Sequence, residues 1–279
     1  MPSRRLPEFV IIGAPKSATT WLVTHLRAQA EVFMPSPELH FFNRNYERGL
    51  DWYATHFSAA RQGQIVGEKS ASYLADPEVP RRLKGALATA KLIVQLRNPV
   101  QRAYSDYCML LRRGEVMDDV ERYLDARNAA LPRFLHDGLY ARHLRAFLDV
   151  FPREQIKIIL YDDVGRDPAA VFAEVAAFVG VRNARLGNAP ERRVKDRTAP
   201  MLPLAVRRVA KPFKPLVAPW RSHRWFQKVH ARLARPVRYP PLSGELHRRL
   251  LDYYADDVAT LEQLLGRNLG RWLEPQPSS

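Results

Sequence analysis

The chain has 279 residues, 46% of them hydrophobic, and 44 Lys and Arg against 29 Asp and Glu give it a formal net charge of +15. This composition suffices for a sizeable folded core and excludes a chain that is disordered throughout. The positive charge suits nucleic acid, an anionic membrane or a polyanionic ligand. No segment has the pattern of a zinc finger, a basic zipper or an RNA-recognition signature, so we expect no nucleic-acid partner.

Targeting and membrane signals are weak. The first apolar run, at residues 9–14, is shorter than a secretory signal core or a spanning helix requires. The single cysteine, Cys108, has no intramolecular disulfide partner and lies in an apolar stretch, which predicts a buried, inert thiol and a reducing compartment. We expect a cytoplasmic protein. The basic segment 206–229 is a candidate for peripheral membrane contact, but it is too charged to cross a bilayer.

Short β-branched runs alternate with helical patterns along the chain. The predicted strands are residues 9–14, 91–96 and 155–161. The predicted helices are residues 21–26, 100–111, 140–151, 169–178 and 242–265. Asn98 and Pro99 are suited to the N-cap and first position of the second helix. Gly180 and Gly266 are suited to end the last two.

This alternation predicts an α/β fold with a mainly parallel, doubly wound central sheet flanked by helices. We expect a single domain over residues 1–279. Residues 187–241 differ from the rest, because they are rich in Pro, Arg and Lys and have weak periodicity. We interpret that segment as a basic insertion or flap.

The loop that follows the first strand has the chemistry of an anion site. It reads Gly-Ala-Pro-Lys-Ser-Ala-Thr-Thr from Gly13 to Thr20, so a lysine and three hydroxyls precede a helix. Backbone amides and the partial positive charge of a helix N-terminus both attract anions. An ordinary capped turn is the alternative, but Lys16 and the hydroxyls exceed what a cap needs. The glycine pattern differs from a Walker loop, which has a second glycine before the lysine.

Three other sites are suggestive but ambiguous on residue type alone. Glu38 and His40 share a face if their segment is extended, although on residue type alone a surface glutamate and a packed histidine are the preferred explanation. Lys69 precedes a predicted helix, where a solvated lysine is ordinary. Arg97 ends a strand, the position at which open α/β sheets bind ligands, and Ser105 follows on the next helix.

The segments around the loop and Arg97 resemble a known family. Residues 13–22, GAPKSATTWL, are similar to the 5′-phosphosulfate loop of sulfotransferases that use 3′-phosphoadenosine 5′-phosphosulfate (PAPS), and Arg97, Pro99, Arg102 and Ser105 match the spacing of their 3′-phosphate segment. The resemblance implies transfer of a sulfuryl group from PAPS to a hydroxyl or amine, with Lys16 at the bridging oxygen. The nucleotide contacts that it implies are Lys16, Ser17, Ala18, Thr19, Thr20, Trp21, Arg97 and Ser105.

Two further segments resemble the heparan sulfate branch of this family. Residues 37–43 are similar to its Lys-Glu-x-x-Phe-Phe run, with Pro37 in place of the usual basic residue. Residues 68–73 are similar to its Glu-Lys-[ST]-x-x-Tyr run. The resemblance implies that Glu38 is the catalytic base, that His40 is a cleft residue or the alternative base, and that Lys69 faces the cleft. It implies an acceptor that is a carbohydrate or a glycosylated or lipid metabolite.

The resemblance covers about residues 8–183 and 240–273 and lapses over the basic segment between them. In the family a basic loop of this region often folds over the nucleotide, which makes Arg192, Arg193 and Lys195 candidates. The disulfide near that loop in the heparan branch cannot form here. No cluster has metal-ligand spacing, and we expect no metal cofactor. The rival functions are a small-molecule kinase, which would require Mg²⁺, and a non-catalytic binder of anionic glycans or membranes.

Overall fold

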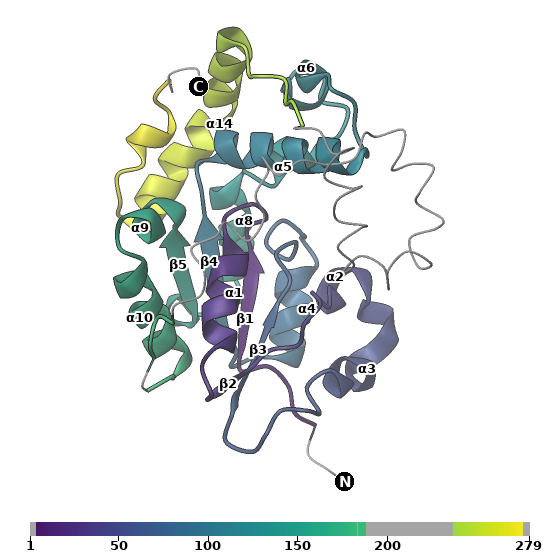
Figure 1. The fold of residues 1–279 in the computed structure, drawn as a ribbon, viewed down its shortest axis with the longest axis vertical. Coiled ribbons are helices and arrows are strands. Elements are labelled where there is room, and N and C mark those ends of the chain that lie inside the picture. The colour runs from purple at the N-terminus through teal and green to yellow at the C-terminus, as the bar shows by residue number, and fades with distance from the viewer. Residues whose placement is uncertain (1–3, 183, 188–236, 276–279) are drawn as a thin grey trace, which may run out of the picture.

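A five-stranded sheet, in which every strand is parallel to its neighbours, forms the centre of the computed structural model (Figure 1). The structure describes residues 4–182, 184–187 and 237–275. The strands lie in the order β2-β3-β1-β4-β5. They are β1 (Phe9–Gly13), β2 (Val32–Phe33), β3 (Ile65–Lys69), β4 (Lys91–Leu96) and β5 (Ile156–Leu160). The predicted α/β class with a parallel sheet is confirmed.

Helices cover both faces of the sheet. The longer ones are α1 (Thr19–Arg27), α4 (Val79–Ala86), α5 (Pro99–Arg113), α8 (Tyr140–Leu148), α10 (Pro168–Val179) and α14 (Gly244–Leu265). The short ones are α2 (Phe41–Arg44), η1 (Tyr46–Arg48), α3 (Gly49–Thr55), α6 (Val120–Leu124), α7 (Arg133–His136), η2 (Arg153–Gln155), α9 (Tyr161–Arg166) and η4 (Gly270–Trp272). No helix of the described residues is both long and apolar enough to cross a membrane.

The alternation of side chains along β1 explains this layering. Phe9 and Ile11 belong to the core cluster that α1 and α10 complete. Val10 and Ile12 belong to the larger cluster that includes residues of α5, α8 and α14. Successive strand residues face opposite sides, so a run that is apolar at every position is buried on both. Each such side chain stabilises the fold by about 1.5–3 kcal/mol relative to an exposed one.

Most predicted helix ends are confirmed. The Asn98 side chain accepts a hydrogen bond from the Gln101 amide at 3.1 Å, and Pro99 is the first residue of α5. Gly180 and Gly266 end α10 and α14 in the left-handed conformation, with φ of 102° and 61°. The sequence pattern did not predict β2, β3, α4 or the short helices, and the last predicted strand extended to Tyr161, which begins α9.

Three strands end at the same edge of the sheet, and their loops meet there. Register pairs Ile11 of β1 with Lys69 of β3 on one side and with Ile93 of β4 on the other. The loops after β1, β3 and β4 are therefore neighbours, which is the position where open parallel sheets bind ligands.

Trp272, near the C-terminus, forms hydrogen bonds at this edge of the sheet. The Trp272 carbonyl accepts a hydrogen bond from Asn98 Nδ2 at 2.8 Å, and the Trp272 indole donates to Asp162 Oδ2 at 2.7 Å. Trp272 thus ties the end of β4 to the start of α9, which follows β5.

Candidate active site

The loop after β1 leaves several backbone amides without a partner among the described residues. Lys16 and Ala18 are both left-handed, with φ of 68° and 63°, and α1 begins directly after them. The amides of Ala18, Thr19 and Thr20 donate no hydrogen bond to any described residue. The first amides of a helix have no partner inside it, and alternating loop conformations gather amides into an anion-binding concavity. The backbone is therefore suited to a phosphate or sulfate.

The hydroxyls of this loop do not all face the same way. Ser17 and Thr19 are buried, whereas Lys16, Ala18, Thr20 and Trp21 are half-buried. Burial raises the pKa of Tyr140 to about 12, and the nearby Ser17 hydroxyl opposes that rise. Ser17 and Tyr140 are therefore neighbouring, uncharged hydroxyls of the interior. The Trp21 ring packs edge-on against Phe172 of α10, with ring centres 6.5 Å apart, so it contributes packing between α1 and α10.

Arg97 joins the end of β4 to the same loop. Its Nη1 donates to the Lys16 carbonyl at 3.5 Å, and its Nε and Nη2 donate to Gln101 at 3.2 and 3.1 Å. The guanidinium lies 4.9 Å from the Tyr161 ring centre. The structure therefore brings the two segments that resemble the family's phosphate-binding segments into direct contact.

Helix α5 flanks Lys16. The Lys16 ammonium contacts Met109 Sδ at 3.5 Å. Ser105 is half-buried one turn earlier, on the same face of the helix as Met109. Arg102, the other basic residue of the matched pattern, is fully buried 4.0 Å from Asp106, and it donates to the Phe134 carbonyl. Arg102 is therefore part of the interior, and Arg97 is the member of the pattern that reaches the loop.

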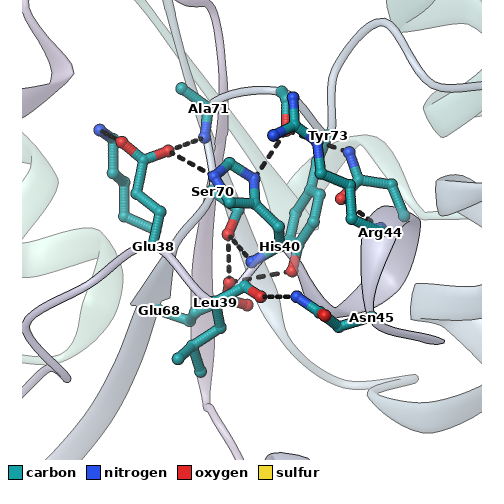
Figure 2. Close-up of polar contacts among 12 residues, drawn as sticks. Glu38, Leu39, His40, Arg44, Asn45, Glu68, Ser70, Ala71 and Tyr73 are labelled. Carbon is teal, nitrogen blue, oxygen red and sulfur yellow. Dashed lines mark hydrogen bonds and ion pairs between the residues drawn. The ribbon is translucent and has the colours of Figure 1, made fainter. Parts of the chain in front are cut away.

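Glu38 is held by the end of β3 (Figure 2). Its Oε1 accepts a hydrogen bond from Lys69 Nζ at 2.5 Å, and its Oε2 accepts one from the Ala71 amide at 3.0 Å. The Lys69 side chain is only 12% exposed. The alternative interpretation of Lys69, a solvated lysine before a helix, is therefore wrong, because Lys69 ends a strand and its ammonium pairs with Glu38.

His40 lies beside the same carboxylate. Its Nε2 is 3.9 Å from Glu38 Oε2, and its Nδ1 is 2.9 Å from Ser72 Oγ, which also accepts from Asn43 at 3.0 Å. The Glu38 and His40 side chains therefore meet, as an extended segment predicts, although His40 itself is left-handed with φ of 48°. Each of the four consecutive residues 69–72 therefore contacts either Glu38 or His40.

The comparisons with known proteins agree with this arrangement. Residues 6–197 match the sulfotransferase domain family. The chain belongs to that family. It is 36% identical over 184 residues to heparan sulfate glucosamine 3-O-sulfotransferase 6 of Mus musculus, which covers 64% of this chain and 54% of the relative. It is 30% identical over 302 residues to the human bifunctional heparan sulfate N-deacetylase/N-sulfotransferase 3, covering 98% of this chain and 32% of the relative. The chain thus spans about half the length, or less, of these relatives.

A solved sulfotransferase shares this fold. The crystal structure of a sulfotransferase from Alicyclobacillus acidocaldarius has a TM-score of 0.68 at 27% identity, and the match covers 97% of this chain and 100% of that one. The resemblance to the sulfotransferase family and to its heparan sulfate members is therefore confirmed. Arg192, Arg193 and Lys195 lie outside the described residues, as do most of segment 187–241 and the whole of segment 206–229.

Burial and the neighbouring residues Lys69, Ala71 and His40 determine the protonation state of Glu38. Burial pushes the pKa of Glu38 up, but the hydrogen bond and charge of Lys69 and the Ala71 amide outweigh it, so the pKa lies below its ordinary value. Burial also lowers the pKa of His40, with Arg44 and Lys69 adding to the effect and Glu38 opposing it. At neutral pH Glu38 is therefore an anion and His40 is neutral, and both can accept a proton.

We expect Lys69→Met to raise the pKa of Glu38. The variant removes the largest influence that lowers this pKa and leaves the desolvation that raises it. Because the pKa is depressed in the wild type, the ionised form persists to a lower pH than for an ordinary carboxyl, and the variant should lose it at a higher pH. An NMR titration of the Glu38 carboxyl carbon measures the shift. Lys91→Met, at the opposite end of the sheet, serves as the control, and an unchanged Glu38 titration in Lys69→Met would contradict this account.

Proposed function

We propose that the protein transfers the sulfuryl group of PAPS to a hydroxyl or amine of a carbohydrate-containing acceptor. The observation that carries the proposal is the adjacency of two sites of different chemistry. An anion-binding loop follows β1, and an ion-paired carboxylate is held by the end of β3, the strand next to it. Sulfuryl transfer requires both, because a charged leaving group must be stabilised close to a group that accepts a proton.

The proposed roles follow from the chemistry of each residue. The loop amides and Thr20 would bind the 5′-phosphate, Lys16 would donate to the oxygen that bridges phosphorus and sulfur, and Arg97 with Ser105 would bind the 3′-phosphate. The acceptor oxygen or nitrogen forms a bond to sulfur while the bond from sulfur to the bridging oxygen breaks. The acceptor proton passes to Glu38, and 3′-phosphoadenosine 5′-phosphate (PAP) leaves. The protein thereby supplies alignment and charge stabilisation.

The acceptor class rests on sequence similarity. Both relatives named above are heparan sulfate enzymes, and the segments around Glu38 and Lys69 resemble those of that branch. A panel with heparan sulfate oligosaccharides, a phenol and a simple alcohol would test the class, with [³⁵S]PAPS as donor. Transfer to the oligosaccharides alone supports a carbohydrate acceptor, and transfer to the phenol alone contradicts it.

Calorimetry with PAP, AMP, ADP and ATP, each with and without Mg²⁺, tests the donor. We expect PAP to bind without Mg²⁺ and more tightly than AMP, since only PAP carries the 3′-phosphate. A preference for ATP with Mg²⁺ would favour the kinase alternative. Absence of all nucleotide binding would favour a non-catalytic binder of anions.

Arg97→Met should weaken PAP binding by about 10- to 100-fold and leave AMP binding nearly unchanged. The expected factor corresponds to the loss of a charge-assisted hydrogen bond of about 1.5–3 kcal/mol. Calorimetry with the two nucleotides isolates the contribution of the 3′-phosphate. Arg113→Met removes an exposed arginine at the other end of α5 and should change neither affinity. Equal losses for PAP and AMP in Arg97→Met would show that Arg97 supports the loop and does not select the 3′-phosphate.

A further inference from the structure

A carboxylate that the proposed mechanism does not use lies buried beneath the segment of Glu38 and His40. Glu68, on β3, is 0% exposed. Its Oε1 accepts hydrogen bonds from Ser70 Oγ at 2.6 Å and the Tyr73 hydroxyl at 2.9 Å, and its Oε2 accepts one from the Tyr53 hydroxyl at 2.6 Å. No Lys, Arg or His of the described residues forms an ion pair with it. Three hydroxyls alone therefore satisfy this buried carboxylate, although burial of a charge without an ion partner costs free energy.

Two of these hydroxyls also hold the backbone of the neighbouring segment. Ser70 Oγ accepts a hydrogen bond from the His40 amide at 2.9 Å, and the Tyr73 hydroxyl accepts one from the Phe42 amide at 3.2 Å. Both amides lie at the start of α2, where the amides of a helix lack internal partners. A hydroxyl that donates to a carboxylate is polarised and becomes a better acceptor for the next group. Figure 2 shows Glu68 at the base of this chain of contacts, with His40 and Glu38 above it.

The conformation of His40 requires such an anchor. Its φ of 48° is in the left-handed region, which residues other than glycine rarely adopt. This conformation turns the chain between Glu38 and α2, so that the His40 ring reaches Ser72 and the Glu38 carboxylate reaches Lys69. If the amides at 40 and 42 were released, the turn would lose the contacts that select it.

We propose that Glu68 is a positioning residue, which through Ser70 and Tyr73 keeps the Glu38 carboxylate and the His40 ring in place beside Lys69. The inference rests on the proposed function, since it assigns Glu68 to the support of the proposed base. Glu68 touches neither donor nor acceptor in this proposal. Its effect reaches the reaction through the backbone of residues 38–42.

The third hydroxyl provides a matched control. Tyr53 donates to the same carboxylate at 2.6 Å, but its hydroxyl contacts no amide of residues 38–42. Tyr53→Phe and Tyr73→Phe therefore remove one hydroxyl each from Glu68 and keep the ring, and only Tyr73→Phe releases the segment. Ser70→Ala removes the hydroxyl that accepts the hydrogen bond from the His40 amide. Glu68→Gln should have a smaller effect than Ser70→Ala, because the amide oxygen still accepts from Ser70 and Tyr73.

The kinetic test separates turnover from binding. With [³⁵S]PAPS and heparan sulfate oligosaccharides, we expect Ser70→Ala and Tyr73→Phe to lower kcat by about 5- to 100-fold, the factor that an unpaired buried amide represents. The Kd for PAP should stay within about twofold, because the loop after β1 is untouched. Tyr53→Phe should keep kcat within about twofold. An equal loss of kcat in Tyr53→Phe and Tyr73→Phe, or wild-type kcat in Ser70→Ala and Tyr73→Phe, would overturn the proposal.

A second measurement does not depend on the acceptor. Hydrogen exchange at the amides of residues 40 and 42 should accelerate by about 5- to 100-fold in Ser70→Ala and Tyr73→Phe and not in Tyr53→Phe. Unchanged exchange in both releasing variants overturns the positioning role, even in an enzyme that is active. A wild type that neither binds PAP nor consumes PAPS overturns the proposed function instead, so the two failures are distinguishable.

Discussion

Glu38→Gln is expected to lower kcat for sulfuryl transfer by about 10²- to 10⁴-fold, the range typical of a lost general base. The variant keeps the shape of the side chain and an oxygen that can accept from Lys69, but it removes the charge that receives the acceptor proton. The loop proposed to bind the donor lies after a different strand, so PAP affinity should change by no more than about twofold. The measurement pairs single-turnover kinetics with PAP calorimetry, and thermal unfolding reveals any loss of stability from the ion pair that Lys69 no longer forms.

The neighbouring histidine makes this a test between two bases. His40 is neutral at neutral pH and lies 3.9 Å from Glu38, so it is the alternative proton acceptor. If His40→Asn lowers kcat far more than Glu38→Gln, then His40 is the base and Glu38 orients it. Glu78→Gln changes an exposed glutamate of an arginine pair and should leave kcat unchanged. Full activity in Glu38→Gln would refute the assignment of Glu38 outright.

Hydrophobic pattern predicted the longer strands that are mostly apolar, and it missed β2, which has only two residues, and β3, whose residues are mixed. Residues 91–96 are buried on both faces, so their pattern marks β4 to the residue. Residues 65–69 form an equally central strand, but it contains Gly67, Glu68 and Lys69, which pattern alone reads as a loop. The glycine is required there, because a Cβ on Gly67 would lie 2.1 Å from the Phe9 ring of the neighbouring strand. The strand is buried because of its tertiary packing, which the pattern of residues 65–69 does not reveal.

The same strand explains which part of the candidate site was predictable. The order of residues identified Lys16, Arg97, Glu38 and Lys69 as chemically suggestive, and family resemblance gave each a role. The residue order did not show that Lys69 pairs with Glu38 at 2.5 Å, nor that Glu68 supports the pair, because both depend on the pairing of β3 with β2, the strand that precedes Glu38. A glutamate directly before a lysine reads as a surface pair. Recognition of residues 65–69 as a buried strand would have placed the two side chains on opposite faces and marked Glu68 as an interior carboxylate.

Lys16→Ala should damage both the binding of the donor and its reaction. In the proposed mechanism the Lys16 ammonium donates to the bridging oxygen, on which negative charge grows as the bond to sulfur breaks. Removal of a preorganised donor of this kind typically costs about 10²–10³ in kcat. The ground-state phosphate also loses a charge-assisted hydrogen bond, so PAP affinity should fall by about 10- to 100-fold. The two losses together make kcat/KM for PAPS the most affected quantity.

The contacts around Lys16 should keep the loop in place in Lys16→Ala, so that the variant tests the ammonium group alone. Its ammonium contacts the Met109 thioether, and the loop around it is fixed by backbone contacts, since Ala14 donates to Gln95 and the Lys16 carbonyl accepts from Arg97. The truncation should therefore leave the loop in place and lower thermal stability little. Lys84→Ala removes a lysine of α4 and should leave both kcat and PAP affinity unchanged. Wild-type turnover in Lys16→Ala would mean that the loop amides alone stabilise the leaving phosphate, and that the lysine serves only to attract the nucleotide. Weakened PAP binding with unchanged kcat would lead to the same conclusion by a separate measurement, because uniform binding changes KM without changing the chemical step.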